Sequence, residues 1–292
     1  MNTWFLLALG SAISSSGTQA LQKLSISRSG YSRWMITFIV NLIGSSILFT
    51  VSYFIGFPEL QAGFWLAIII TGILNVITFP VMLRAYEIGE FSSVYSMILL
   101  TPVFLFITSF IFLKELPSVA GFFGVILTIF GLWLMAREKN GHDGIENYVR
   151  GNALGMLVAL IWSVSINFDK LATRHSDAFF APAVGMMIIF VSAGVYLILR
   201  GNAILSNKEN NIKIGTAGIV ILLALGISMA LSNVLHNSAL LYGFATYTIA
   251  IKRIGILFGV LWGWLFFKEK NLRQKLTGAG VAVAGVAMIL LA

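Results

Sequence analysis

Residues 244–267 read FATYTIAIKRIGILFGVLWGWLFF, an apolar stretch with two adjacent cations inside it. This stretch is long enough to cross a lipid bilayer as a helix, because about 20 residues span the hydrocarbon core. Lys252 and Arg253 nevertheless lie roughly 10 Å inside it, at a rise of about 1.5 Å per residue. A charge at that depth costs about 2.5–3.5 kcal/mol on insertion scales. We therefore expect the two side chains to face a cavity, a ligand or a charged partner.

The helix face that carries Lys252 also carries three glycines, Gly255, Gly259 and Gly263. Small residues allow two helices to approach closely, so this face is predicted to contact another helix and Lys252 to point inward. Arg253 lies about 100° further round the helix, beside larger aliphatic residues. The alternative for both cations is that their long side chains extend to the membrane surface.

The composition of the chain is that of an integral membrane protein. Of its 292 residues, 58% are hydrophobic and 10% are charged, with a mean hydropathy of +0.92. Soluble domains carry about 25% charged residues. The net charge of +8 comes from basic residues in short connectors, which argues against a nucleic-acid partner. The chain contains no cysteine, which excludes disulfides and thiolate metal sites. Residues 1–20 lack a basic beginning, so we interpret them as part of a first span and not as a cleaved signal.

The hydrophobic pattern predicts an all-α membrane protein with ten transmembrane helices, because isolated backbone polar groups are not tolerated in lipid. The only strongly polar stretch, residues 137–150, separates two predicted domains, 1–140 and 141–292, of five helices each. The predicted spans are 3–24, 31–55, 60–86, 91–113, 117–136, 151–173, 178–200, 213–241, 246–267 and 272–292.

The two halves resemble each other at a constant offset of 154 positions. Coincidence among apolar helices is the alternative, but the offset holds across several motif positions. Lys23 and Lys170 also occupy similar places in the first span of each half. Because five spans is an odd number, the second repeat must be inverted in the membrane, as in many secondary transporters. The matched pairs are Ala85 with Ala239, Gly89 with Gly243, Phe112 with Phe266, Lys114 with Lys268, Glu115 with Glu269, Gly124 with Gly278, and Gly131 with Gly285.

The repeated motif resembles a known family. The segments AYEIG at 85–89, PVF at 102–104 and FLKEL at 112–116, followed by Gly124 and Gly131, are similar to the EamA-type domain of the drug/metabolite transporter superfamily. The resemblance covers essentially the whole chain. It implies two inverted five-helix repeats around a central cavity. The second half departs from the pattern, with Ile256 in place of the proline and Asn271 opposite Pro117.

The distribution of basic residues predicts the orientation. Connectors on one side of the ten-span scheme carry fourteen Lys and Arg residues, and those on the other side carry three. The positive-inside rule then places connector 137–150 in the cytoplasm and both termini outside. The family resemblance implies the opposite orientation, and we follow the distribution of basic residues. We expect a multi-pass protein of the plasma membrane, specifically a bacterial inner membrane.

Polar residues inside the spans are candidates for a substrate site. For the amides the alternative is hydrogen bonding between helices, and for the histidine a structural role. No acidic residue is predicted at mid-depth, since Asp169 falls near the end of span 151–173. No metal-ligand spacing or cofactor motif occurs, and we predict neither a metal nor a cofactor. The candidate substrate-binding residues are Lys252, Arg253, Asn75, Gln19, Asn233, His236, Asn167 and Tyr95.

Small multidrug exporters of the same superfamily depend on a carboxylate in the first helix. Here that helix offers serines and Gln19, which disfavours export of lipophilic cations. The Lys252–Arg253 pair instead resembles the pair with which the sugar-phosphate translocator branch binds phosphate. That branch also uses a basic residue in its fourth helix, and span 91–113 has none inside it. A carboxylate therefore fits nearly as well as a phosphate.

These observations together predict a secondary transporter and not an enzyme. Its substrate is expected to be a small organic metabolite with a carboxylate or phosphate, moved by alternating access, and the protein to be a monomer or homodimer in the lipid bilayer. The alternatives are a membrane protein without transport activity or an intramembrane hydrolase that uses His236.

Overall fold

The computed structural model describes residues 3–291 except positions 99, 102–103, 106–107, 109–110, 113, 115–117, 137–144, 201–214 and 269–271. The regular elements of the described residues are α-helices, which agrees with the predicted all-α class. They are α1 (Thr3–Arg28), α2 (Arg33–Ile55), α3 (Phe64–Ile88), α4 (Phe91–Ile98), α6 (Val119–Ala136), α7 (Ile145–Arg174), α8 (Phe180–Arg200), α9 (Thr216–Tyr242), α10 (Ala245–Lys252), α11 (Gly255–Phe267) and α12 (Leu272–Leu291).

The surface of the bundle confirms a multi-pass membrane protein. By length and apolar composition, α2, α3, α7, α8, α9 and the combined α10–α11 segment each suffice to cross a membrane. Large apolar side chains are exposed on them, including Phe54 at 78% and Ile198 at 81%. Apolar exposure on this scale is rare on soluble monomers and is expected of lipid-facing helices.

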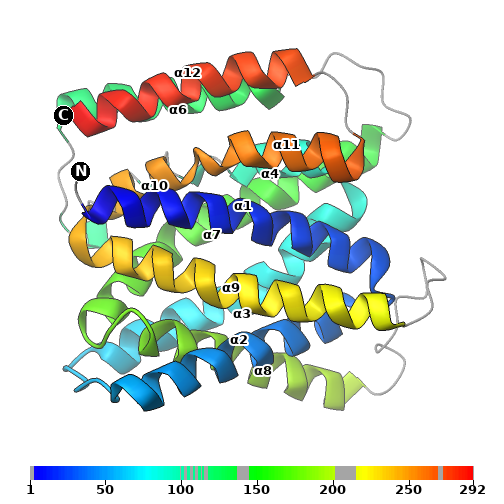
Figure 1. Ribbon diagram of the computed structural model, residues 1–292, viewed down its shortest axis with the longest axis vertical. Coiled ribbons are helices and arrows are strands. Elements are labelled where there is room, and N and C mark those ends of the chain that lie inside the picture. Colours follow the sequence, from blue (N-terminus) through cyan, green and yellow to red (C-terminus); the bar gives the residue numbers. More distant parts are fainter. Residues whose placement is uncertain are drawn as a thin grey trace.

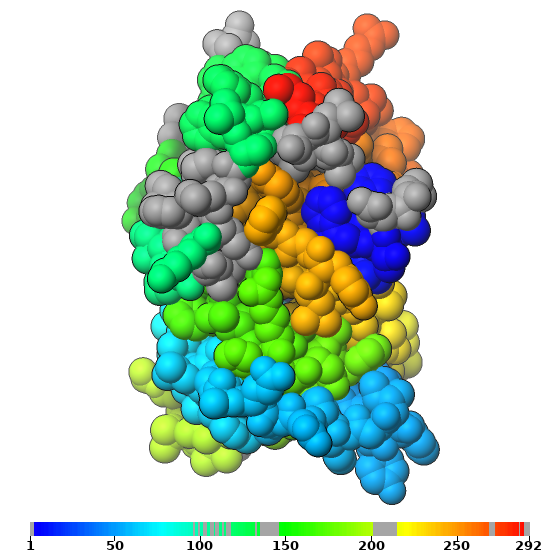
Figure 2. Space-filling model, turned by 90° about the vertical axis from the view of Figure 1, so that its left-hand side faces the viewer, coloured from blue at the N-terminus to red at the C-terminus, as the bar shows by residue number. Residues whose placement is uncertain are grey.

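The helices lie roughly side by side, with the two chain termini at the same end of the bundle (Figure 1). Neighbouring helices come from different halves of the chain. α1 packs against α9, and in the equivalent contact α7 packs against α3. α2 packs against α8, and α6 packs against α12. The end of the bundle that carries the N-terminus shows the beginning of α10 between α1 and α7 (Figure 2). Segments from both halves therefore share each packing layer.

The α6–α12 pair lies at one edge of the bundle (Figure 1), and among the described glycines it has the shortest contact with a backbone atom. A Cβ atom on Gly131 would lie 2.3 Å from the Ala282 nitrogen, and a Cβ on Gly285 would lie 2.4 Å from the Thr128 nitrogen. Gly131 and Gly285 were matched in the sequence. Each allows the backbone of the other helix to approach, which is the role of small residues in membrane helix packing.

Two lysines tie the first and third helices of each half together. Lys23 Nζ donates to the carbonyl oxygens of Tyr86 and Gly89, the latter at 2.9 Å, at the end of α3. Lys170 Nζ donates to the Gly243 carbonyl at 2.7 Å, at the end of α9. Lys170 was one of the three basic residues counted on the less basic side, with Lys114 and Arg174. That count was wrong for Lys170, because the residue is only 1% exposed. The carbonyls that end a helix lack helical partners, and a lysine satisfies them well.

The predicted span 246–267 is interrupted at its two cations. α10 ends at Lys252 and α11 begins at Gly255. Between them the bonds shorten to i→i+3, from the Ile254 nitrogen to the Ile251 oxygen and from the Ile256 nitrogen to the Arg253 oxygen, both about 3 Å. Such a short 3₁₀ turn inside a helix is common at functional hinges. At the other end of α11, Lys268 has φ of 55°, and its sequence match Lys114 has φ of 53°.

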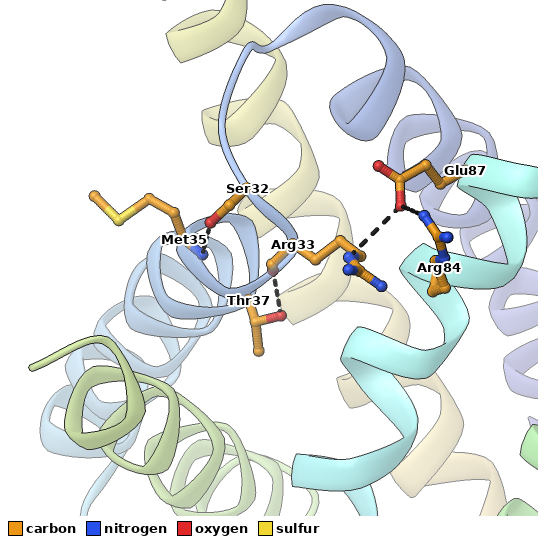
Figure 3. A network of polar contacts seen from close by, with 6 residues as sticks. All are labelled: Ser32, Arg33, Met35, Thr37, Arg84 and Glu87. Carbon is orange, nitrogen blue, oxygen red and sulfur yellow. Dashed lines mark hydrogen bonds and ion pairs between the residues drawn. The ribbon is translucent and has the colours of Figure 1, made fainter. Parts of the chain in front are cut away.

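An ion pair of 2.8 Å joins Arg84 and Glu87 near the end of α3. Arg33, at the beginning of α2, approaches the same carboxylate oxygen at 3.6 Å (Figure 3). Ser32 caps α2 by accepting a hydrogen bond from the Met35 nitrogen. The contact of Arg33 with Glu87 thus joins the beginning of α2 to the end of α3.

Several predicted features lie outside the described residues. They include Pro102, Glu115, Glu269, most of connector 137–150, the basic residues Arg137, Lys139, Lys208, Lys213 and Lys270, and part of span 91–113. The other predicted spans coincide with helices whose ends differ from the prediction by up to six residues.

Candidate functional site

A polar cavity of about 170 Å³ lies between helices of the two halves. Its described lining comes from α1, α2, α3, α7, α8, α9 and α10 together with Arg253. One wall is apolar and formed mainly by α8. The polar and charged lining residues are Ser15, Thr18, Gln19, Gln22, Asn41, Thr71, Asn75, Asp169, Ser232, Asn233, His236, Asn237, Lys252 and Arg253.

Lys252 lines this cavity, as expected for a cation turned away from lipid. The glycine face beside it is packed as predicted, because a Cβ on Gly255 would lie 2.4 Å from the Ala12 carbonyl of α1. A Cβ on Gly259 would lie 2.7 Å from the Tyr95 ring. Among the described residues, no hydrogen bond or ion pair joins the Lys252 ammonium to the protein. Its charge is therefore available to a molecule in the cavity.

Arg253 also lines the cavity and is buried, with 4% of its surface exposed. Its guanidinium lies within electrostatic reach of the Tyr95 and Tyr86 phenols. Tyr86 in turn donates to the Gln19 side-chain oxygen at 2.9 Å. The Arg253 Nε has no hydrogen-bond partner in the described part of the chain. A buried guanidinium with an unpaired N–H is unusual and is a strong donor for an anion.

Asp169 is the main residue that the sequence reasoning placed wrongly. It lines the cavity, although its position in the sequence indicated the end of a span. The Asp169 Oδ1 accepts a hydrogen bond from the Thr71 hydroxyl at 2.5 Å, and its charge interacts with that of Lys252. The expectation that no acidic residue lies near the cations is therefore wrong. A signal existed, since Trp162, Ser165 and Asp169 share one face of α7 at helical spacing.

Asn75 belongs to a network that fixes the α3–α7 side of the cavity. Its amide nitrogen donates to the Ser165 hydroxyl at 2.9 Å, and its oxygen accepts from the Trp162 indole at 3.2 Å. Ser165 and Thr71 share a further hydrogen bond of 2.6 Å. The neutral groups thus hold each other in place and orient the Asp169 carboxylate through Thr71.

His236, Asn233 and Asn237 bring one side of α9 to the cavity. The Asn237 oxygen accepts from the Thr173 hydroxyl at 2.6 Å, which anchors it to α7. The Nδ1 of His236 is buried without a hydrogen-bond partner in the described residues. In total, four of the eight such buried atoms line the cavity: Gln22 Oε1, Asn41 Oδ1, His236 Nδ1 and Arg253 Nε.

Two of the eight predicted site residues, Asn167 and Tyr95, are not among the described residues that line the cavity. The Asn167 amide donates to the Thr108 hydroxyl at 3.1 Å and to the Ser163 carbonyl at 2.7 Å. It therefore joins α7 to the fourth span, which was the alternative role considered for the amides. Tyr95 is 2% exposed and stacks on Phe91 with ring centroids 5.6 Å apart. Its phenol interacts electrostatically with the Arg253 guanidinium.

Comparison with known proteins is consistent with this architecture. The model of the EamA-like transporter family matches the chain twice, over residues 2–137 and 149–291. A curated relative, described as an uncharacterized transporter of Methanothermobacter thermautotrophicus strain Delta H, is 24% identical over 227 residues, which is 76% of this chain. The chain spans 63% of that relative's length.

A crystal structure with the same fold superposes with a TM-score of 0.76 at 14% sequence identity, covering 99% of this chain and 96% of the other. At that identity the similarity shows the fold alone. The two family matches together cover nearly the whole sequence, and the gap between them, residues 138–148, falls in the polar stretch that separates the halves. The chain therefore belongs to the EamA-like transporter family.

Proposed function

We propose that the protein is a secondary transporter that binds an anionic group of a small organic metabolite with Lys252 and Arg253. The observation that carries this proposal is the pair of cations at the cavity, because neither side chain has a hydrogen bond or ion pair to a described residue. An ammonium and a guanidinium in a site of low dielectric constant favour a carboxylate or phosphate. The cavity is smaller than the roughly 300–1,000 Å³ of pockets for drug-sized ligands, which supports a small substrate.

Alternating access between two inverted repeats is part of the same proposal. The reciprocal packing of α1 with α9 and α3 with α7 supports a two-fold relation between the halves. So do the equivalent Lys23 and Lys170 bonds. Lys114 and Lys268 are equivalent positions of the two halves. Close to Lys114, the Ser118 nitrogen donates to the Tyr247 hydroxyl at the beginning of α10. Next to Lys268, the Phe267 ring contacts Phe91 at the end of α11. These contacts of equivalent positions with opposite ends of the α10–α11 segment support the proposed inverted relation between the halves.

In this proposal ten helices cross a plasma membrane, such as a bacterial inner membrane, and the substrate binds between the repeats. An intramembrane hydrolase would need a nucleophile within hydrogen-bond reach of His236. No hydroxyl of the described residues hydrogen-bonds to that imidazole, and His236 instead borders the two cations. The geometry therefore favours a role for His236 in binding.

The test begins with purified protein and a thermal-shift screen of small metabolites, grouped as carboxylates, phosphate esters and neutral analogues. An anion that stabilises the protein is then supplied to proteoliposomes for uptake measurements. Lys252→Ala should abolish saturable uptake while the protein remains folded, and Lys252→Arg should retain part of it because charge is kept but geometry changes. Normal uptake by Lys252→Ala would refute the proposal. Cleavage of a peptide by the wild type would instead indicate a hydrolase.

A further inference from the structure

Asp169 shares the cavity with the cation pair, and its carboxylate is held in a defined position. Thr71 donates to the Asp169 Oδ1 at 2.5 Å, and Thr71 is itself bonded to Ser165 at 2.6 Å. Asn75 donates to Ser165 at 2.9 Å. Helices α3 and α7 thus fix the acidic group on one side of the cavity, while α10 brings Lys252 to the lining from another helix.

The two opposite charges influence each other without forming an ion pair. The charge of Asp169 interacts electrostatically with that of Lys252. No salt bridge between the two side chains occurs in the described part of the chain. Both groups therefore keep hydrogen-bonding capacity toward a molecule in the cavity. An anion that binds Lys252 must also experience repulsion from the fixed Asp169 carboxylate.

The charged residues of the lining allow a charge balance. Lys252 and Arg253 contribute two positive charges and Asp169 one negative charge, which leaves a net charge of one positive when the His236 imidazole is neutral. A single negative charge on the substrate neutralises this cavity. A doubly charged phosphate ester would leave one negative charge uncompensated, and an uncompensated charge is costly in a site of low dielectric constant.

We propose, on the basis of the proposed function, that Asp169 restricts the cavity to monovalent anions, so that the substrate carries one carboxylate and not a doubly charged phosphate ester. In this assignment Asp169 is a specificity-determining residue. It limits how much negative charge the site accepts. The rival role for Asp169 is to bind a positive group on the substrate.

Three probes with the same carbon backbone separate these roles: glycerate, glycerol 3-phosphate and serine. At pH 7.5 the phosphate ester is mostly doubly charged, because its second ionisation occurs near pH 6. Dissociation constants are measured by thermal shift for the purified wild type and for Asp169→Asn. Asp169→Glu keeps the charge, and Glu59→Gln removes an acidic charge from an exposed connector away from the cavity.

The wild type should bind glycerate at least about tenfold more tightly than glycerol 3-phosphate. Asp169→Asn should reduce that preference by about tenfold by tightening the binding of the phosphate ester. Asp169→Glu and Glu59→Gln should keep the wild-type preference. Thermal unfolding of each variant without ligand shows whether it is folded, and the asparagine keeps the oxygen that accepts from Thr71.

An unchanged preference in folded Asp169→Asn would overturn the assignment. So would a wild type that binds serine most tightly and loses serine when Asp169 is replaced, because Asp169 would then bind the substrate ammonium. Lys252→Ala separates this failure from that of the proposed function. If neither anionic probe binds in a Lys252-dependent manner, the anion site itself is refuted, and the role of Asp169 falls with it.

Discussion

Replacing Gly131 by alanine should destabilise the protein by forcing apart the α6–α12 crossing. The added Cβ would lie 2.3 Å from the Ala282 nitrogen and 2.5 Å from the Gly278 oxygen, where ordinary contacts begin at 3.4 Å. The two backbones must therefore separate locally by roughly 1 Å, since neither is a flexible side-chain end. Overpacking of this kind costs about 1–3 kcal/mol, and the better helix propensity of alanine offsets up to about 1 kcal/mol. We expect a net loss of about 1–2 kcal/mol.

The assay is reversible unfolding in mixed micelles with increasing SDS, which reports the free energy of unfolding. Gly280→Ala, in the partner helix α12, is a matched control because a Cβ there meets nothing within 4 Å. That control should be neutral or slightly stabilising. Gly285→Ala, whose Cβ would meet the Thr128 nitrogen at 2.4 Å, should resemble Gly131→Ala.

Combining Gly131→Ala with Gly285→Ala tests whether the two glycines serve one crossing. Once the first alanine has separated the helices, the second should cost less, so the double variant should lose less free energy than the two single losses combined. Two outcomes would contradict the described packing: Gly131→Ala as harmless as Gly280→Ala, or full additivity in the double variant.

The remaining predictions concern the link between α7 and α9 and the orientation in the membrane. Lys170→Met should lower the free energy of unfolding by about 1–3 kcal/mol, because the Gly243 carbonyl loses its donor. The control is Lys114→Met, at an exposed position, and an equal loss in both variants would argue against the link between α7 and α9. Because the chain lacks cysteine, single cysteines at Gln61 and Asn140 can be labelled from each side of the membrane. The basic-residue distribution predicts labelling of Asn140 from the cytoplasm and of Gln61 from outside, and the reverse pattern would favour the orientation that the family resemblance implies.

Much of the fold could be predicted from the sequence because lipid constrains it strongly. Apolar length predicted where helices occur, and the constant offset matched pairs such as Lys114 with Lys268 that share an unusual positive φ. The break after Lys252 was not predictable from hydropathy, since the apolar stretch continues through it. The break coincides with a tertiary contact that hydropathy does not report, the close approach of Gly255 to the Ala12 carbonyl.

The site was predicted in part, and the error has a physical reason. Depth along a span was estimated from its ends, and this indicated that Asp169 lay near the surface. The distance of a residue from the end of its span does not decide whether it reaches a cavity between helices. Asp169 hydrogen-bonds to Thr71, which lies well inside α3. Asn167 was predicted as a site residue, and it shares one face of α7 with Ser163 and Lys170. That face does not line the cavity. It instead contacts Thr108 and Gly243, while the Trp162–Asp169 face lines the cavity.

Asp169 also explains how the cations are tolerated when no substrate is bound. In the proposed function the substrate must be released, so Lys252 and Arg253 cannot depend on it alone for compensation. The turn between α10 and α11 provides little compensation, because the carbonyls of Ile249, Ala250, Ile251 and Arg253 already accept backbone hydrogen bonds there. The beginning of α11, which carries a partial positive charge, also follows directly at Gly255. Asp169 instead supplies a negative charge that is held in place by Thr71 and interacts with Lys252. One fixed carboxylate thus offsets one of the two cations in the empty cavity and leaves the other for the substrate.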